Sequence, residues 1–561
     1  MTAALAAVAF PAIAPATDRH WNVPDGQWAQ GLDWNPFNVP GLTDNAILDY
    51  FSGGSAGITR LNVSTISAVT SVSVLNGSTF TIQNFGSLFC GQDMIVGQTS
   101  TQGTLNLING NPIQAFIAGF TTAGSLRLGV NSGAGVVNQN AGTVVVGNVL
   151  TVGDSSDPSS GFRGAGTYNM SGGTLIVGTI QVGNANFAGS LSSSTTAAGT
   201  FNLSGSAVIN VSSVEIGKSA TGHDYGIGVF NQSGGNFQAY HVLIGDDFFQ
   251  TPNNTFNLSG GTYECIQNGS TTLNRGSVFN YTGGWFAPGD LTIDGAQMIV
   301  SPGGNKIIRA GSVQVADTPT LLGVLDLNDN KITINFRDDF DLRQMIQRGF
   351  NGGMWNGSGI TSSTAAATRL SALPRALGYG YDRGTPDAVV YTVYGDADLD
   401  GDADGVDIGT WALNFTGELG GNISTATKYW EDGDWDYDGD VDGVDAGLWA
   451  RDFTGELGGG GLGALLLDLP NVNPGAAAIL RGMGITVVPE PAAAFLAIGG
   501  MSILFRLRTR PRRVCSTLCH PERTREGSRE SDGAGSSRSL ASTLGMTKCL
   551  VATSRCARRS N

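Results

Sequence analysis

The sequence predicts a mainly β protein: a parallel β-helix (solenoid), followed by a small α-helical module and a C-terminal transmembrane stretch. Three observations lead to this prediction. The 561 residues include 83 glycines and only 14% charged residues, which favours turns and repeats over helices. A short phrase recurs beside strands of alternating polarity in the middle of the chain. Two copies of a loop with an amphipathic helix follow these repeats.

The recurring phrase consists of an aromatic or aliphatic residue, Asn, any residue, Ser or Thr, and Gly, between about residues 103 and 295. Its asparagines are 23 to 33 residues apart in the full copies. A unit of this size cannot bury its apolar face alone, so the units are expected to stack. We expect each asparagine to occupy the same corner of its rung, where it bonds backbone and tolerates left-handed geometry. The full copies begin at Tyr168, Phe201, Phe230, Phe256 and Phe279, and a weaker copy begins at Val137.

Alternating apolar residues that end in glycine follow the phrases, as in Leu150, Val152 and Gly153. The same pattern ends at Gly183, Gly217 and Gly245. The repeats resemble autotransporter-associated β-repeats, which implies the solenoid fold. An antiparallel sandwich with regular turns is the alternative interpretation.

Alignment of the rungs by this glycine places polar and charged residues in one column. A carbohydrate-processing site is one hypothesis, since β-helix lyases and hydrolases place acids and bases on neighbouring rungs. A solvated turn with a weak salt bridge is the favoured one, because surface ion pairs at turns are ordinary. The nearby His223 and His241 are interpreted as ordinary loop histidines. The column consists of Asp154, Asn184, Lys218 and Asp246.

Two twelve-residue loops, 396–407 and 434–445, carry aspartates on alternating positions and glycine at the sixth position. A cation of calcium's size takes six to eight oxygens, and a loop that turns sharply at glycine wraps alternate side chains around it. The spacing therefore predicts paired calcium sites. A solvated acidic run is disfavoured because charge runs do not repeat ligand spacing with a glycine in register. The candidate ligands are Asp396, Asp398, Asp400, Asp402, Asp404 and Asp407, then Asp434, Asp436, Asp438, Asp440, Asp442 and Asp445.

At two positions of the loops we expect a particular mode of metal ligation. At the seventh position, Asp402 and Asp440 are expected to ligate through their backbone carbonyls. The twelfth position is Asp rather than the bidentate Glu of an ordinary EF-hand, which predicts a different closing geometry. Without metal, the carboxylates repel one another, so the module is expected to be poorly folded until calcium binds.

Each loop precedes one apolar helix face, with residues at i, i+3, i+4 and i+7. These are Ile408, Trp411, Ala412 and Phe415, then Ala446, Trp449, Ala450 and Phe453.

The duplicated loop and helix, over about residues 394–455, resembles the type I dockerin family. That resemblance implies two calcium-binding units packed with near two-fold symmetry. In the family, the tenth and eleventh loop positions help to recognise a cohesin partner and commonly carry hydroxyl residues. This chain departs from that pattern with Gly405 and Val406, then Gly443 and Val444. A cohesin-like partner of a different kind stays open.

The two ends of the chain predict export. Residues 1–16 are almost wholly apolar and end in small residues, as in the remnant of a signal peptide; a buried apolar segment is the alternative. Near the other end, Pro489-Glu490-Pro491, an apolar stretch and a cluster of arginines follow one another. This order resembles the PEP-CTERM sorting signal, which implies membrane insertion and processing by exosortase-type machinery. The tail after the arginines carries four of the six cysteines, which leaves Cys90 and Cys265 without a disulfide framework.

The segment between the repeats and the loops is expected to contain a strand at Lys331–Phe336 and a helix near Asp341–Arg348. It resembles the connector that precedes dockerin-type repeats in planctomycete surface proteins, and it is expected to cap the open end of the solenoid. The predicted organisation is a signal-peptide remnant (1–16), a β cap with the first rungs (17–102), solenoid repeats (103–324), a capping or connector module (325–394), paired calcium loops (395–456), a linker (457–487), a sorting signal with a transmembrane stretch (488–513) and a disordered or spurious tail (514–561).

Three functional hypotheses follow. The favoured one is an exported, non-enzymatic structural or adhesive protein of the cell surface or extracellular matrix, with exopolysaccharide as a partner. The second is a scaffold-tethered polysaccharide lyase or glycoside hydrolase, for which Glu215, Asp246 and Asp247 are the candidate carboxyls. The third is a calcium-gated partner of a cohesin-like protein. Nucleic acid is not expected as a partner, because the net charge is −15.

Overall fold

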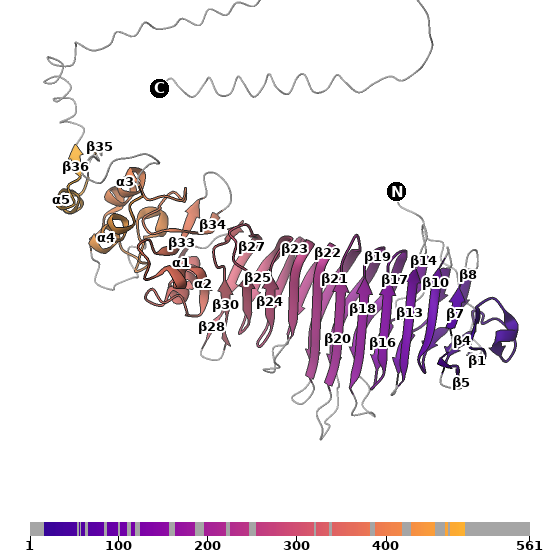
Figure 1. Cartoon of the computed structure of the whole chain (residues 1–561). Helices are drawn as coiled ribbons and strands as arrows, with labels where there is room; N and C mark the ends of the chain where they lie inside the picture. The colour runs from indigo at the N-terminus through magenta and orange to yellow at the C-terminus, as the bar shows by residue number, and fades with distance from the viewer. Residues whose placement is uncertain are drawn as a thin grey trace, which may run out of the picture. The chain divides into compact units, whose positions relative to one another are not determined.

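Parallel strands stack rung upon rung in the solenoid (Figure 1), and the mainly β, β-solenoid-like prediction is confirmed. The computed structural model describes residues 16–488 except 53–54, 57, 62–65, 84–86, 99–100, 109–113, 118–123, 156–162, 186–195, 220–224, 246–253, 319–320, 336–338, 382–386, 418–427, 455–465 and 469–471. The predicted signal-peptide remnant, apart from Ala16, lies outside these residues, as do the tail and the sorting signal from Pro489 onward. His223, Asp246 and Asp247 also lie outside them.

The first part of the described chain forms short strands around a tryptophan cluster. Trp21 and Trp28 both meet Trp34 edge to face, at 5.1 and 5.0 Å between ring centroids, and Trp28 also packs on Phe80 of an early rung. The elements are β1 (Thr17–Trp21), β2 (Asp25–Gln27), a 3₁₀ turn (Gly31–Asp33), β3 (Trp34–Asn35), β4 (Asp44–Leu48), β5 (Phe51–Ser52), β6 (Ser55–Ala56), β7 (Ile58–Leu61), β8 (Ile66–Val69) and β9 (Ser71–Val74).

The rungs of the solenoid form three columns of parallel pairings. One column runs through β7, β10, β13 and β16, a second through β8, β11 and β14, and a third through β9, β12 and β15. The strands are β10 (Ser78–Gln83), β11 (Ser87–Cys90), β12 (Met94–Gln98), β13 (Gln102–Ile108), β14 (Gln114–Ile117), β15 (Leu126–Val130), β16 (Ala134–Gln139), β17 (Thr143–Asp154), β18 (Gly164–Met170), β19 (Thr174–Ala185), β20 (Thr196–Leu203), β21 (Val208–Ser219), β22 (Tyr225–Ile244), β23 (Thr255–Leu273), β24 (Val278–Tyr281), β25 (Trp285–Ile293), β26 (Gln297–Val300) and β27 (Ile307–Val315). Because these neighbours pair in parallel, the antiparallel sandwich is wrong.

The recurring phrase sets the register of the first column. Tyr168 pairs with Phe201, and Phe201 with Phe230, and the same register continues to Phe256 and Phe279. The rings stack inside the solenoid with centroids 4.7 to 4.9 Å apart. Stacked apolar rings therefore form a continuous core that single rungs lack.

The asparagines of the phrase lie at equivalent positions, as predicted, but not at a corner. They lie within strands, and each side-chain NH₂ group donates to the side-chain Oδ1 of the asparagine on the preceding rung at 2.8 to 2.9 Å. None of these described asparagines has a positive φ. The predicted left-handed geometry and backbone bonding are therefore wrong, since the parallel register places like side chains beside one another. The ladder runs through Asn106, Asn138, Asn169, Asn202, Asn231, Asn257 and Asn280.

Glycine makes the sharp bend instead. Gly153 has φ 77°, and a Cβ there would lie 2.1 Å from the carbonyl oxygen of Ala198 on the next rung. Any larger residue would force the rungs apart. The column after this glycine is confirmed for Asp154, Asn184 and Lys218, which pair in register.

The last rungs lead into a mixed region. Here β31 pairs in parallel with β27 but antiparallel with β34, and β34 pairs antiparallel with β33, so the sheet closes without a free edge at β31. The predicted strand and helix of this segment are present as β31 and α1. The elements are β28 (Asp317–Thr318), β29 (Leu321–Leu322), β30 (Val324–Asp326), β31 (Lys331–Ile334), α1 (Asp339–Phe350), β32 (Gly359–Thr361), α2 (Ser363–Thr368), β33 (Arg375–Tyr381) and β34 (Asp387–Val393).

The remaining elements are α3 (Gly405–Asn414), a 3₁₀ turn (Trp430–Asp432), α4 (Gly443–Asp452), β35 (Leu466–Asp468), α5 (Pro474–Gly482) and β36 (Thr486–Val488). The predicted helix faces are confirmed in α3 and α4, since Ile408, Trp411, Ala446 and Trp449 are fully buried. Among the described residues, no helix has the length and apolar character needed to cross a membrane.

Candidate metal centre

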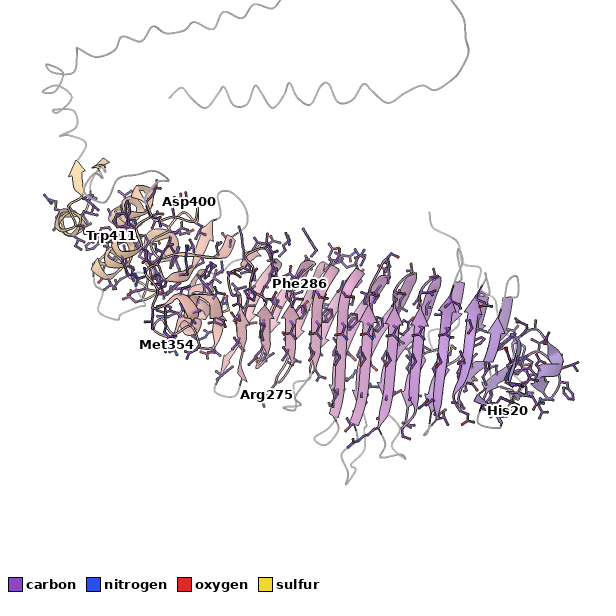
Figure 2. All side chains as sticks on the ribbon, viewed as in Figure 1. His20, Arg275, Phe286, Met354, Asp400 and Trp411 are labelled. Carbon is purple, nitrogen blue, oxygen red and sulfur yellow. The ribbon has the colours of Figure 1, made fainter. Side chains whose placement is uncertain are left out.

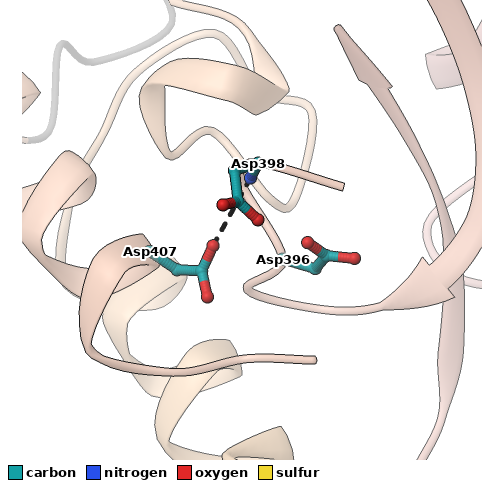
Figure 3. Close-up of side chains that lie close together, drawn as sticks. All are labelled: Asp396, Asp398 and Asp407. Atoms are coloured by element: carbon teal, nitrogen blue, oxygen red, sulfur yellow. Dashed lines mark hydrogen bonds between the residues drawn. The ribbon is translucent and has the colours of Figure 1, made fainter. Parts of the chain in front are cut away.

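The carboxylates of each acidic loop converge. Figure 3 shows Asp396, Asp398 and Asp407, which offer one oxygen each within 4.8 Å of the others. A second group in the same loop consists of Asp402, Asp404 and Asp407, which also offer one oxygen each within 4.8 Å of one another. The second loop repeats both groups, as Asp434, Asp436 and Asp445, then Asp440, Asp442 and Asp445.

Five of the six predicted ligands in each loop therefore belong to one of two groups, and the two groups share the aspartate at the twelfth position. The remaining ones, Asp400 and Asp438, lie outside these groups; their Oδ1 atoms accept the N–H of Asp402 and Asp440 at 3.2 and 3.0 Å. The side chains of Asp402 and Asp440 themselves belong to the groups. Ligation through their carbonyls stays a prediction.

The twelfth position closes each loop and lies in the first turn of each helix. Asp407 Oδ1 accepts the N–H of Ala397 at 2.8 Å, and its Oδ2 accepts the N–H of Asp404 at 2.7 Å. Asp404 in turn caps α3 by accepting the N–H of Val406, which completes a capping box. Asp445 and Asp442 do the same for α4. Aspartate is short enough to serve as helix cap and converging ligand at once.

Backbone geometry repeats between the loops. Gly401 and Gly439 have φ of 101° and 96°, and the fourth-position residues Leu399 and Tyr437 have φ of 60° and 66°. Bulky residues rarely adopt a positive φ, so the surrounding contacts must hold this turn. The sequence pattern thus produces one loop conformation twice.

The two loop–helix units are held together by reciprocal hydrogen bonds. Trp411 Nε1 donates to the carbonyl of Asp442 at 2.8 Å, and Trp449 Nε1 donates to the carbonyl of Asp404 at 2.9 Å. The eighth loop positions are bonded crosswise too, since Ala403 N–H donates to Thr454 Oγ1 at 2.8 Å and Val441 N–H to Thr416 Oγ1 at 2.9 Å. Each unit therefore supports the other unit's loop. In Figure 2, Asp400 and Trp411 mark this part of the chain.

Burial destabilises the ionised form of several aspartates in the loops. Desolvation raises the pKa of Asp407 and of Asp445 to about 8, against the opposing effect of their N–H donors. It also raises the pKa of Asp434 well above its usual range, and the neighbouring Asp445 and Asp436 carboxylates raise it further. Converging buried carboxylates become stable as anions when a cation joins them.

Several residues that support the loops were not predicted from the sequence. The Thr392 hydroxyl donates to Asp396 Oδ2, and Trp430 Nε1 donates to the Asp396 carbonyl. The Tyr437 hydroxyl donates to the Leu377 carbonyl of β33 at 3.0 Å. Arg343 of α1 lies with Nη1 3.9 Å from Asp434 Oδ2. Trp430 and Arg343 are distant in sequence from the aspartates that they contact, and Thr392 precedes the first loop, so spacing within the loops carries no signal for these contacts.

The candidate glycosidase carboxyls do not form a comparable cluster among the described residues. Glu215 Oε2 receives Lys218 Nζ at 2.8 Å and Gln181 Nε2 at 2.7 Å. In the polar column, Asp154 is buried rather than solvated, with Oδ2 2.6 Å from Arg127 Nε, so the expectation of a solvated turn is wrong there. His241 Nδ1 lies 3.1 Å from Ser270 Oγ.

The chain matches no protein-family model, no curated protein and no solved structure. Fold and site therefore define a class only: a mainly β, solenoid-like protein whose acidic loops have the side chains to hold metal ions.

Proposed function

We propose that this chain is an exported, non-enzymatic structural or adhesive protein of the cell surface or extracellular matrix. In this proposal, a dockerin-like pair of calcium loops stiffens the end of a β-solenoid. The observation that carries the proposal is the doubled loop, in which buried carboxylates converge twice with the same turn, the same caps and reciprocal bonds between units.

The donor set favours a hard divalent cation. Every side-chain candidate is a carboxylate, whereas zinc and copper sites use histidine and cysteine. Calcium accepts six to eight oxygens in flexible geometry, and magnesium demands a near-ideal octahedron with retained waters. Six aspartates along one short loop suit the larger and more adaptable ion. In the first loop, the carboxylates of Asp396, Asp398 and Asp407 would coordinate the ion directly. In the second loop, those of Asp434, Asp436 and Asp445 would do the same.

A structural role is supported by what surrounds the polar residues of the solenoid. The described carboxyl of the enzymatic hypothesis, Glu215, is occupied by an ion pair and an amide hydrogen bond. Catalysis of glycosidic cleavage needs two carboxyls facing each other across a substrate. The asparagine ladder and the stacked rings instead stabilise a long repeated scaffold.

Export and anchoring rest on the sequence of the two ends. The apolar residues 1–16 and the PEP-CTERM-like segment 488–513 support secretion, passage through exosortase-type machinery and attachment by the C-terminal stretch. Extracellular calcium is millimolar, which suits loops of modest affinity. Exopolysaccharide or a cohesin-like protein is the proposed partner.

Isothermal titration calorimetry of the purified full chain with CaCl₂, after chelator removal, tests the proposal. Two ions per chain are expected, with higher thermal stability in calcium than in chelator. MgCl₂ is expected to bind more weakly. The double variant Asp398→Ala with Asp436→Ala should lose binding, whereas Asp290→Ala in β25, outside the loops, should retain it. Absence of calcium binding to the folded wild-type chain would overturn the proposal.

A further inference from the structure

The two acidic loops share their sequence pattern and most of their internal hydrogen bonds. They share all six aspartates, the glycine turn and the capping box. Asp396 and Asp434 accept the N–H of Gly401 and Gly439, respectively, at 3.0 Å in both loops. On these grounds alone the loops are expected to bind calcium with equal affinity.

The loops differ at the first position. Asp396 Oδ2 receives the Thr392 hydroxyl from outside the loop, and its Oδ1 accepts the Asp400 N–H at 3.0 Å. In the second loop the corresponding N–H, that of Asp438, donates to Asp436 Oδ1 at 3.1 Å instead. Asp434 instead lies beside the guanidinium of Arg343, with Nη1 3.9 Å from Oδ2, and both residues are almost completely buried. Within the described part of the chain, Asp434 Oδ1 has no hydrogen-bond donor. A fully buried carboxylate oxygen without a donor indicates a missing cationic or polar ligand on that side.

The guanidinium also covers the turn of the second loop. A Cβ at Gly439 would lie 2.3 Å from Arg343 Nη1. At the corresponding Gly401, no atom of the described residues comes within 4 Å of that point. The positive charge of Arg343 is therefore specific to the second loop and lies close against its backbone.

We infer that Arg343 makes the two calcium sites unequal, so that the second loop binds calcium more weakly than the first. The inference rests on the proposed function. Arginine stays protonated at all accessible pH values. Without calcium, Arg343 lies against the Asp434 carboxyl and the turn at Gly439 and stabilises the ion-free loop. With calcium, the same charge repels the ion. Both effects lower the affinity of the second loop.

Calorimetric titration of the full chain should therefore resolve two classes of calcium site that differ about tenfold or more in dissociation constant. Single ligand variants assign the classes. Asp436→Ala should remove the weaker class, and Asp398→Ala should remove the tighter one.

Replacement of the arginine tests the cause. Arg343→Met should tighten the weaker class to within about threefold of the tighter class, whereas Arg343→Lys should leave it weak. Arg348→Met is the matched control on the same helix, because Arg348 pairs with Asp317 at 3.2 Å and donates to the Val315 carbonyl. It should leave both classes unchanged.

The outcomes separate the inference from the proposal on which it rests. No calcium heat in the folded wild-type chain overturns the proposed function. Two equal sites in the wild type, or loss of the weaker class in Asp398→Ala, overturn the inference and leave the function intact. If Arg343→Met does not fold, the two aspartate variants still decide which loop is weaker, and Arg343→Gln takes its place as the uncharged variant.

Discussion

Replacement of Asp445 by asparagine tests the paired loops at the residue that closes the second one. Asp445 accepts the N–H groups of Trp435 at 2.7 Å and Asp442 at 2.9 Å, and it belongs to both groups of converging oxygens in its loop. Asparagine is nearly the same size, but it keeps only one acceptor oxygen. Its NH₂ group would face one of these two N–H donors.

The expected loss in the free energy of unfolding has two parts that can be measured separately. A buried N–H donor left without an acceptor costs about 1–3 kcal/mol, so the chelated variant should be destabilised by roughly that amount. In calcium at a thousand times the dissociation constant, each bound ion adds about 4 kcal/mol of stability. A variant that no longer binds in the second loop should therefore lose about 6 kcal/mol in calcium, and only about 2 kcal/mol in chelator.

Urea denaturation followed by tryptophan fluorescence, in calcium and in chelator, measures both parts, and calorimetry measures the stoichiometry. We expect one ion per chain for Asp445→Asn and two for Asp432→Asn. Asp432 is a suitable control because it precedes the loop and pairs with Lys428 at 3.7 Å. Two ions bound by Asp445→Asn, with equal losses in calcium and in chelator, would refute the assignment of Asp445 as a closing ligand.

Three further predictions concern pH and the solenoid. In chelator, thermal stability measured by scanning calorimetry should fall as pH rises from 5 to 8, and saturating calcium should abolish the fall. Burial raises the pKa of Asp407 and Asp445 to about 8 in the folded state, above the ordinary carboxyl value of the unfolded state. Proton binding by these two groups therefore stabilises the folded state fully below the ordinary carboxyl pKa, and this stabilisation is lost as the pH rises to 8. Phe230→Ala should destabilise the solenoid by about 3–5 kcal/mol in urea denaturation, because this ring stacks 4.8 Å from Phe201 and 4.7 Å from Phe256. The calcium stoichiometry should not change. A loss of stability below about 1 kcal/mol would contradict the continuous core. Asn202→Asp should cost about 1–3 kcal/mol at pH 7, since Asn202 donates to Asn169 and an ionised Asp cannot; a loss that did not diminish at pH 3 would argue against the ladder.

The fold could be predicted where the sequence repeats itself. The period of the repeats predicts that like residues stack, and the register of Phe201 with Phe230 follows directly. Turn propensity predicts the wrong position for the asparagines, whereas the alternation of buried and exposed residues predicts the right one. In Phe201-Asn202-Leu203 the ring and the leucine are buried and the asparagine lies on the other face, which is the period of a strand. Asparagine in a strand is stabilised only by the neighbouring rung, and a propensity cannot contain that contact.

The site could be predicted where it is local. Twelve consecutive residues fix the ligand spacing, the turn at Gly439 and the helix cap, so the loop pattern is readable without tertiary information. Arg343 comes from a helix inserted between two rungs, and Thr392 comes from the strand before the first loop. Their positions depend on how the last rungs close, and no spacing rule connects them to the aspartates.

The two acidic loops contact the strands that close the end of the solenoid, so the proposed metal sites bear on the stability of that end. A stack of parallel rungs ends in an edge strand that is prone to pair with other chains. Here β31 is covered by β34, and β34 by β33. Both loops reach β33 through their fourth positions: the Tyr437 hydroxyl donates to the Leu377 carbonyl and receives the Leu377 N–H, and a Cβ at Gly378 would lie 2.6 Å from Leu399 Cδ2. The positive φ of Leu399 and Tyr437 is thus held from outside the loops. Because the same two residues set the loop turn and contact β33, ordering of the loops by calcium would stabilise the strand pair that closes the sheet.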